Sequence, residues 1–247
     1  MPHLDFLDET LRDGQQSLWG MRMQAAHALP VAGTLDRTGF SRIDLAASSF
    51  MEVLIKFCRE DPWAGLDLIQ AQITRTPTRG GMRSNAAVSM GITPPDLMDA
   101  WMRQLNRHGV RSFWIYDVLY NFHHIDRLAR VAKEFGSEIA GTVFFTQSPI
   151  HTDELFAEQV ANMAAIDGVD TILFYDTAGV LLPDRIRTLV PKIVAAAGGK
   201  PVEMHSNNLM GTSTLAYCEA IQHGVSVIHT ASRPMANGPS VRSTEVM

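Results

Sequence analysis

The chain has few cysteines, a deficit of positive charge and no long apolar run, and each shortage excludes a class of protein. Only Cys58 and Cys218 occur among 247 residues, and they show no metal-binding spacing. Lys and Arg number 21 against 26 acidic residues, which argues against nucleic-acid binding because that function needs a basic surface. No stretch approaches the ~20 apolar residues that span a bilayer, and the first residues are acidic where a signal peptide is basic. We therefore expect a cytoplasmic protein with neither membrane nor nucleic-acid partners.

Short apolar runs alternate with amphipathic stretches along the chain. With 46% hydrophobic and 19% charged residues, this length suits one globular domain, and we expect residues 1–247 to form it. The predicted strands cover residues 3–7, 42–46, 69–83, 110–117, 138–145, 171–175, 201–205 and 225–231. The predicted helices cover residues 24–37, 50–59, 95–107, 122–134, 153–165, 183–196 and 212–222, and several of them end near a glycine.

Eight strands alternating with seven helices predict an α/β fold, namely a (β/α)8 TIM barrel. The alternative is an open doubly wound sheet, which is disfavoured because no G-x-G-x-x-G follows the first strand. Only residues 232–247 follow the last strand, so we expect the eighth helix to be short or missing. Either the chain is a fragment truncated at its C-terminus, or a partner covers that side. An uncovered apolar seam would favour a homo-oligomer.

Polar side chains follow several predicted strands at the end where such barrels carry their chemistry. Asp13 comes shortly after the first strand, and His205 and Asn207 lie at the end of the seventh. Positions i and i+2 of a strand point the same way, so these three side chains can converge on one divalent ion. Histidine, carboxylate and amide ligands suit Zn, Mn or Co.

Arginines lie at the same ends of the predicted strands. Arg12 and Arg83 could clamp a substrate carboxylate or an enolate oxygen, because a planar two-pronged donor fits such groups. Asp117, at the end of the fourth strand, is a further candidate for substrate binding. Tyr175, at the end of the sixth strand, is a candidate general acid.

Each of these residues also has a purely structural interpretation. Arg12 and Asp13 could form an ion pair inside the barrel. His205 could be a hydrogen-bonded core histidine, and Asn208 could cap the helix that follows. Tyr175 could pack at the rim of the barrel. None of these residues is specific alone, and their joint placement at strand ends carries the prediction.

The ordered segments resemble the superfamily of metal-dependent lyase and carboxyltransferase barrels that includes HMG-CoA lyase and isopropylmalate synthase. Within it the chain is similar to the carboxyltransferase branch, which includes the carboxyltransferase domain of pyruvate carboxylase and the oxaloacetate decarboxylase alpha subunit. The matching segments are DETLRDGQQSLWGMRM (8–23), REDPW (59–63), YDVLYN (116–121), SPIHTD (148–153), DTAGVLLP (176–183), HSNNLMG (205–211) and HTASRPMANGPSVRST (229–244).

The resemblance implies transfer or loss of CO2 at an enolate, with a metal that polarises a 2-oxo acid such as pyruvate or oxaloacetate. By this resemblance Asp13 is the carboxylate ligand of the metal, and His205 is a ligand from the seventh strand. Arg12 would stabilise the enolate oxygen, Gln16 would bind the substrate's carbonyl or carboxylate, and Arg83 would hold its carboxylate.

Four positions depart from the family pattern. Tyr175 stands where the family has a carbamylated lysine ligand, and Asn207 replaces its second histidine. Pro239 replaces the threonine that shuttles a proton to carboxybiotin, and Met90 replaces an aromatic residue. These departures argue against biotin-dependent transfer by the family's usual route. Biotin would have to come on a separate carrier protein, because the chain has no biotinyl-lysine segment.

The leading hypothesis is therefore a metal-dependent carboxyltransferase or decarboxylase that acts on a small 2-oxo acid. The first alternative is an aldol or Claisen-type C–C lyase or synthase, since the same barrel performs that chemistry. The second is a catalytically idle paralogue that serves as an assembly subunit.

Overall fold

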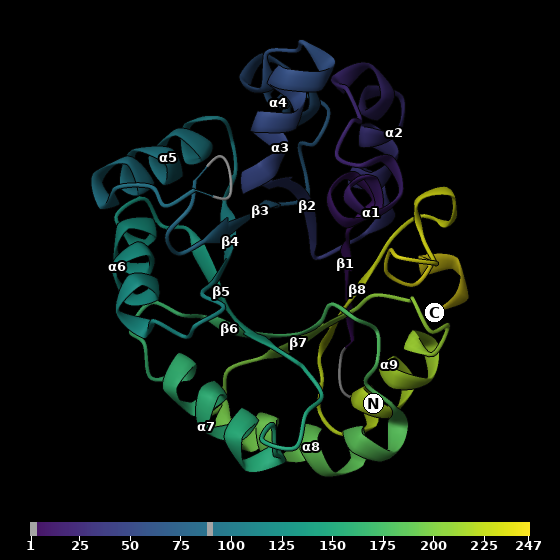
Figure 1. The fold of residues 1–247 in the computed structure, drawn as a ribbon. Coiled ribbons are helices and arrows are strands. Elements are labelled where there is room, and N and C mark those ends of the chain that lie inside the picture. Colours follow the sequence, from purple (N-terminus) through teal and green to yellow (C-terminus); the bar gives the residue numbers. More distant parts are fainter. Residues whose placement is uncertain (1–3, 88–90) are drawn as a thin grey trace.

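Eight parallel strands close into a barrel in the order in which they follow one another along the chain (Figure 1). The computed structural model describes residues 4–87 and 91–247. The strands are β1 (Asp5–Asp8), β2 (Arg42–Ala47), β3 (Thr78–Arg83), β4 (Ser112–Tyr116), β5 (Glu138–Phe144), β6 (Thr171–Asp176), β7 (Val202–Ser206) and β8 (Val227–Thr230). This confirms the predicted TIM barrel and excludes the open doubly wound sheet. Residue 3 of the first predicted strand lies outside the described residues, and so does Met90, which was named as a departure from the family pattern.

Helices surround the barrel and pack their apolar faces on the outside of the strands (Figure 1). They are α1 (Gln15–Trp19), α2 (Ala25–Thr38), α3 (Ser48–Val53), α4 (Pro62–Gln70), α5 (Pro95–Arg107), α6 (Phe122–Lys133), α7 (Asp153–Ala164), α8 (Pro183–Ala196) and α9 (Ser213–Gln222). The π-helical turns η1 (Thr10–Gly14) and η2 (Leu54–Cys58) adjoin α1 and α3. None of the helices described is both long and apolar enough to cross a membrane.

The sequence prediction was wrong between residues 60 and 77. Helix α4 occupies a stretch for which no helix was predicted, and β3 begins nine residues later than expected. Asp61 caps the helix, because its carboxylate accepts hydrogen bonds from the backbone N–H groups of Trp63 and Ala64. Pro62 occupies the first turn, where its missing N–H costs nothing. Pro62 therefore begins a helix that the alternating pattern did not predict.

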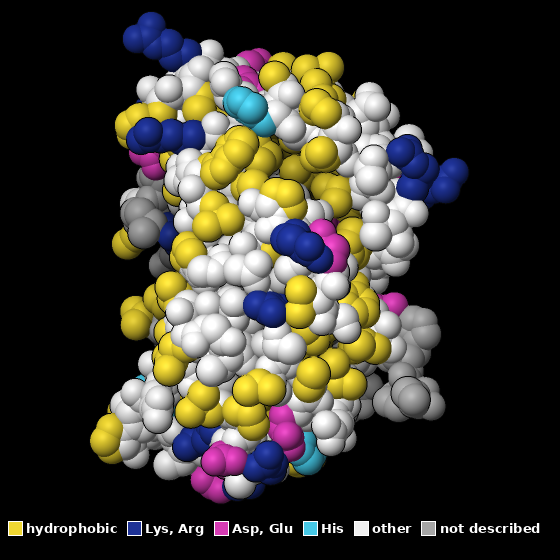
Figure 2. Space-filling view, turned by 90° about the vertical axis from the view of Figure 1, so that its right-hand side faces the viewer, with side chains coloured by type: hydrophobic (Ala, Val, Ile, Leu, Met, Phe, Trp, Pro, Cys, Tyr) yellow, Lys and Arg dark blue, Asp and Glu magenta, His cyan; other side chains and the backbone are white. Residues whose placement is uncertain are grey.

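The chain after β8 forms two 3-10 turns, η3 (Arg233–Met235) and η4 (Thr244–Val246), and no α-helix within the described residues. This agrees with the short or missing eighth helix. The segment folds back on the strand ends instead, through β-bridges of Val241 to Asn207 and of Ser243 to Ala231. All four residues of β8 are buried, and the first two of β1 are half-buried. The seam is therefore better covered than the sequence suggested, although Figure 2 shows apolar side chains over much of this side.

Asp36 of α2 fixes the chain that leads into β3. Its carboxylate accepts hydrogen bonds from the backbone N–H groups of Thr74, Arg75 and Thr76, at 2.8–3.2 Å. Burial alone would raise its pKa, but these donors outweigh burial and lower the pKa to about 2.

We expect Asp36→Asn to lower the free energy of unfolding by about 1–3 kcal/mol at pH 7, because hydrogen bonds to a charged acceptor are stronger than those to an amide. The stabilisation is complete above the ordinary pKa of 3.8 and is lost as the pH falls towards 2. Urea unfolding at pH 7 and pH 2.5 measures this. Glu158→Gln, on the exposed face of α7, is the control and should change stability by less than about 0.5 kcal/mol. An equal loss at both pH values would contradict the charge-based explanation.

Candidate active site

A cavity of about 140 Å³ opens among the C-terminal ends of the strands. Residues of β2 to β6 and of the chain after β1 line it. The lining residues are Arg12, Gln16, Ala47, Ser48, Ser49, Gly81, Arg83, Trp114, Tyr116, Phe144, Tyr175 and Thr177. Four of the predicted site residues, namely Arg12, Gln16, Arg83 and Tyr175, therefore meet at one cavity. This is the end of a parallel barrel at which enzymes of this fold carry their active sites.

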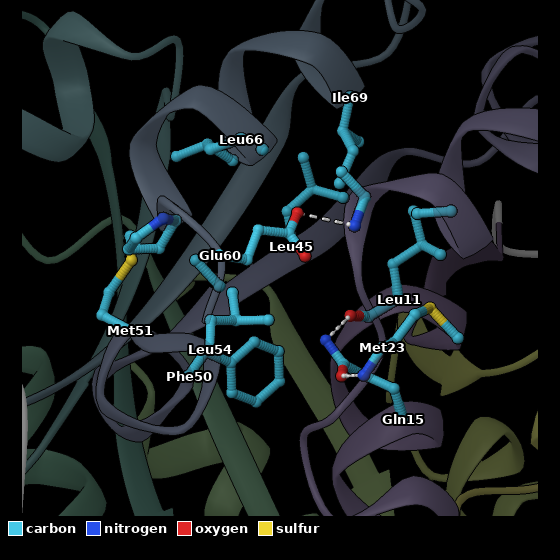
Figure 3. Close-up of a pocket in the computed structure, with 15 residues that line it drawn as sticks. Leu11, Gln15, Met23, Leu45, Phe50, Met51, Leu54, Glu60, Leu66 and Ile69 are labelled. Carbon is cyan, nitrogen blue, oxygen red and sulfur yellow. Dashed lines mark hydrogen bonds between the residues drawn. The ribbon is translucent and has the colours of Figure 1, made fainter. Parts of the chain in front are cut away.

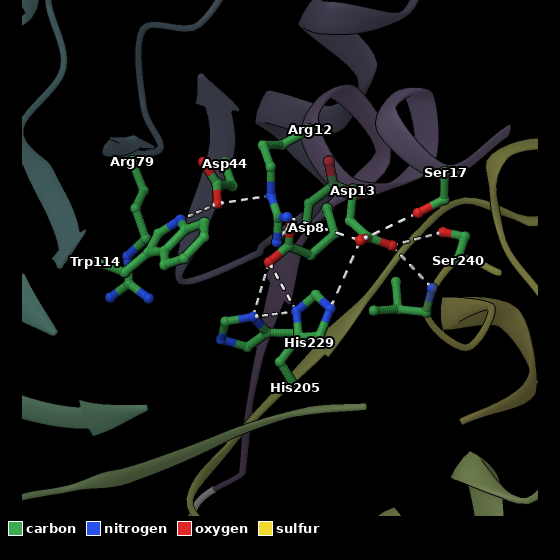
Figure 4. Close-up of polar contacts among 12 residues, drawn as sticks. Asp8, Arg12, Asp13, Ser17, Asp44, Arg79, Trp114, His205, His229 and Ser240 are labelled. Atoms are coloured by element: carbon green, nitrogen blue, oxygen red, sulfur yellow. Dashed lines mark hydrogen bonds and ion pairs between the residues drawn. The ribbon is translucent and has the colours of Figure 1, made fainter. Parts of the chain in front are cut away.

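Arg12 is held rigidly in the turn η1. Its guanidinium lies 2.7 Å from Glu9 Oε2, its Nε donates to Asp44 Oδ2 at 3.1 Å, and its Nη1 donates to the Tyr175 hydroxyl at 3.3 Å. It also lies 5.0 Å from the ring centre of Trp114. Its side chain is only 2% exposed, so the charge is desolvated where it lines the cavity. Figure 4 shows its contact with Asp44.

The side chains of Arg83 and Asp117 lie in different surroundings. Arg83 lines the cavity, and its Nε donates to the Tyr116 hydroxyl at 2.9 Å. The Asp117 carboxylate accepts hydrogen bonds from the Ser84 hydroxyl and from Leu119 N, and it is not among the lining residues described. Asp117 therefore holds the loop after β4, and its expected role in substrate binding stays a prediction.

Several hydrogen-bond donors surround the carboxylate of Asp13. Asn207 Nδ2 donates to both of its carboxylate oxygens at 3.2 Å, and the Ser240 hydroxyl and Val241 N donate at 3.0 and 3.1 Å. The Ser17 hydroxyl lies 3.3 Å away (Figure 4). Asn207 follows β7, and Ser240 and Val241 lie near the end of the chain, so Asp13 holds the C-terminal segment over the barrel.

Asn207 turns the nitrogen of its side-chain amide towards Asp13. The same nitrogen donates to Pro239 O at 2.9 Å, so both partners accept hydrogen bonds and together fix this orientation of the amide. Gly179 makes room for this arrangement: its φ is +63°, and a Cβ there would stand 2.1 Å from Asn207 O.

Tyr175 covers His205. The two rings stack with centres 3.9 Å apart and an angle of 11° between their planes. Burial raises the pKa of the Tyr175 phenol well above its usual range despite the neighbouring Arg12, so the hydroxyl keeps its proton. Burial also lowers the pKa of His205, whose Nε2 lies 3.7 Å from Asp13 Oδ1. Arg12 Nη1 is likewise 3.7 Å from Asp13, so the predicted ion pair inside the barrel is present but long.

Sequence reasoning missed a second buried layer beneath these residues. His229 lies 2.8 Å from Glu9 Oε1 through Nδ1 and 3.2 Å from Glu203 Oε2 through Nε2. Arg79 pairs with Glu203 at 2.5 Å. The spacing of Glu203 and His205, two positions apart on β7, was a signal that both point into the barrel.

The pKa values of the buried acids shift in different directions. Burial raises the pKa of Asp8 and of Asp44 to about 7. Burial would raise the pKa of Glu9 as well, but Arg12 and the two histidines lower it well below its usual range. Hydrogen bonds to Glu203 and Glu9 outweigh burial and raise the pKa of His229.

A second cavity, of about 50 Å³, lies outside the barrel between η1, α2, α3 and α4 (Figure 3). Apolar side chains such as Leu11, Met23, Phe50 and Leu66 line most of it. Gln15 spans its edge, because its side chain donates to Leu11 O and accepts from Met23 N. It lacks the convergent charges of the first cavity. We therefore place the candidate active site at the C-terminal ends of the strands, which we call the mouth of the barrel.

No protein-family model matches the chain, but it is similar to several curated proteins. It is 29% identical over 239 residues to a pyruvate carboxylase subunit of Methanocaldococcus jannaschii, with 97% of this chain and 42% of that protein covered. It is 28% identical over 239 residues to the 2-oxoglutarate carboxylase large subunit of Hydrogenobacter thermophilus, with 96% and 36% covered. The methylmalonyl-CoA carboxyltransferase 5S subunit of Propionibacterium freudenreichii is 24% identical over 236 residues, with 95% and 46% covered. The chain thus spans less than half the length of these relatives.

The fold agrees with solved structures of one such enzyme. The carboxyl transferase domain of Rhizobium etli pyruvate carboxylase, solved with pyruvate, superposes with a TM-score of 0.93 at 21% identity. The match covers 100% of this chain and 42% of that one. These comparisons confirm the resemblance to the carboxyltransferase barrels.

We expect Gly81→Ala to disturb the wall of the cavity. A Cβ at Gly81 would stand 2.2 Å from the ring of Trp114, whose Nε1 donates to Asp44 Oδ2 at 2.7 Å. The indole must move, which should cost about 1–3 kcal/mol of stability and change the tryptophan fluorescence. Urea unfolding followed by fluorescence measures both effects.

Gly33→Ala is the matched control. Gly33 lies within α2, and a Cβ there would meet the flexible end of Arg37 at 3.3 Å and Gln72 O at an ordinary contact distance of 3.8 Å. This variant should be neutral or more stable by up to about 1 kcal/mol. Equal stability of the two alanine variants would show that Trp114 has room to shift.

Proposed function

We propose that this chain forms an active site for decarboxylation or carboxyl transfer at the enolate of a small 2-oxo acid such as oxaloacetate or pyruvate. The observation that carries the proposal is the meeting of Arg12, Gln16 and Arg83 at one cavity in the mouth of the barrel. The similarity to subunits of pyruvate and 2-oxoglutarate carboxylases supports the same chemistry.

Four of the cavity residues have a role in that reaction. Arg83 holds the substrate carboxylate that is not lost, and Gln16 donates to its carbonyl or carboxylate oxygen. When the bond from C3 to the departing carboxylate breaks, CO2 leaves and the electron pair passes to the carbonyl oxygen as an enolate. Arg12 and the protonated Tyr175 hydroxyl stabilise that oxygen, because they are fixed donors in a desolvated site. Protonation at C3 then gives the shortened 2-oxo acid.

The metal site expected at Asp13, His205 and Asn207 stays a prediction, and the contacts described do not fit it. A metal ligand must offer a lone pair, whereas Asn207 offers N–H donors to Asp13. The Asp13 oxygens already accept hydrogen bonds from Ser240 and Val241. We therefore route no step of the reaction through an ion at these three residues.

Two partners belong to the proposal. Another Rhizobium etli carboxyl transferase structure was solved with oxamate and biotin, which supports a biotin carrier as the CO2 donor or acceptor. Pro239 has no hydroxyl to pass a proton to such a carrier, and its carbonyl is bound to Asn207. Decarboxylation without carboxyl transfer is accordingly the simplest activity for these residues. The second partner that we propose is another copy of this chain, in a homo-oligomer.

A specific observation also favours the assembly subunit as a second candidate. The donors around Asp13 tie the C-terminal segment to the mouth and leave this carboxylate engaged in structure. Such a subunit would keep the barrel fold but would catalyse no reaction. The assay described next separates the two candidates.

Arg83→Lys tests the role of the cavity. In metal-free buffer the wild-type chain should release pyruvate from oxaloacetate faster than the buffer does. Lysine keeps the charge but loses the two-pronged contact, so KM should rise about 10- to 100-fold while kcat changes by only a few-fold. Arg187→Lys, which alters a surface pair with Glu219, should behave as wild type. A wild-type rate equal to that of buffer would reject the activity and favour the assembly subunit.

Tyr175→Phe tests the phenol as a donor. The ring and its stacking on His205 remain, and only the hydroxyl bound to Arg12 is lost. Loss of one positioned donor to the enolate oxygen should lower kcat by ~10²–10⁴ with little change in KM. If kcat stayed within a few-fold of wild type, Tyr175 would only fill space above His205. Steady-state kinetics on the two purified proteins decides between these outcomes.

A further inference from the structure

Three metal-ligand side chains meet inside the barrel, beneath the candidate active site. Glu9 follows β1, His205 lies on β7 and His229 lies on β8, so distant parts of the chain contribute them. Each offers one ligand atom, and these atoms all lie within 4.8 Å of one another. All three residues are fully buried. Figure 4 shows the two imidazole rings side by side below Arg12, and their planes are 79° apart.

The spacing of the three atoms is that of ligands around one ion. Glu9 Oε1 lies 2.8 Å from His229 Nδ1 and 3.3 Å from His205 Nδ1, and the two Nδ1 atoms are 3.2 Å apart. Two atoms bound to one tetrahedral zinc ion stand about 3.3 Å apart, because each bond is about 2.0–2.1 Å long. Without an ion, these three atoms can find partners only through hydrogen bonds in which they share protons with one another.

Two of the three ligands, Glu9 and His229, are also oriented through their other polar atom. Glu9 Oε2 lies 2.7 Å from the Arg12 guanidinium, and His229 Nε2 lies 3.2 Å from Glu203. His205 Nε2 has no hydrogen bond and lies 3.7 Å from Asp13 Oδ1. A carboxylate behind each ligating histidine is the usual arrangement in protein metal sites, because it fixes the ring and makes the ligand more basic.

The surrounding charges favour a cation. Five buried carboxylates surround the cluster or belong to it, namely Asp8, Glu9, Asp13, Asp44 and Glu203. The buried guanidinium groups paired with them are those of Arg12 and Arg79. Burial raises the pKa of Asp8 and Asp44 to about 7, but Glu9, Asp13 and Glu203 alone outnumber the two arginines. An unbalanced charge is costly in a buried region.

We propose that Glu9, His205 and His229 bind one divalent transition-metal ion, with Zn²⁺, Co²⁺ or Mn²⁺ suited to the two imidazoles and one carboxylate. This site shares His205 with the set expected from the sequence but uses neither Asp13 nor Asn207 as a ligand. It does not depend on the proposed decarboxylation and is tested without substrate.

The experiment measures Co²⁺ and Zn²⁺ bound to the purified full chain after dialysis against metal-free buffer. Wild type should retain about one ion per chain and gain thermal stability when metal is added. Glu9→Gln and His229→Gln should each weaken binding at least ~10-fold and abolish the gain. Asn207→Ala should keep the ion, and so should the surface control His223→Gln.

Several results would overturn the site. These are a wild-type chain that binds no ion after reconstitution, and a His229→Gln variant that binds as wild type does. A loss of metal in Asn207→Ala with none in Glu9→Gln would place the ion at Asp13 instead. If a buried variant fails to fold, X-ray absorption of the Co²⁺-loaded wild type decides, because it should count two imidazole ligands. One imidazole or none would refute the proposal.

Discussion

The Arg12 guanidinium is the charge on which the mouth of the barrel depends. Burying an unpaired guanidinium costs several kcal/mol, so its position is tolerable only with Glu9 and Asp44 beside it. These contacts tie the chain after β1 to β2, while the Tyr175 hydroxyl and the Trp114 ring add β6 and β4. A single side chain thus couples four strand ends that are far apart in sequence, and it does so at the wall of the candidate active site.

Asp13 connects the mouth to the end of the chain in a similar way. Where a complete (β/α)8 barrel would place a helix after β8, this chain returns to the mouth and bridges Asn207 and Ala231. The carboxylate of Asp13 binds Ser240 and Val241 of that return segment. Asp13, which the resemblance assigns to a metal, therefore binds the segment after β8, and the Asn207 amide donates to the same carboxylate.

The architecture and the location of the site could be predicted from the sequence because both depend on local patterns. Buried parallel strands appear as apolar runs, and polar residues at their C-terminal ends mark the mouth. The partners of those residues could not be predicted, because they depend on strand register and on which side each strand residue faces. Glu9 follows a strand and His229 lies in an apolar strand, so neither position alone indicates the contact between them. Helix α4 was missed since Pro62 suits either a turn or a first helical turn.

The division between a buried polar network and a partly open cavity determines which substitutions report on chemistry. Removing Arg12 or Glu9 would leave an unpaired buried charge, so a loss of activity in such a variant would combine misfolding with a lost substrate contact. Arg83 and Gln16 line the same cavity but are only half-buried and exposed, respectively. Changes there alter the surface offered to a substrate while the ion pairs below stay intact. Under the proposed function, variation at Arg83 and Gln16 would therefore change substrate specificity, whereas Arg12 is constrained by the fold that surrounds it.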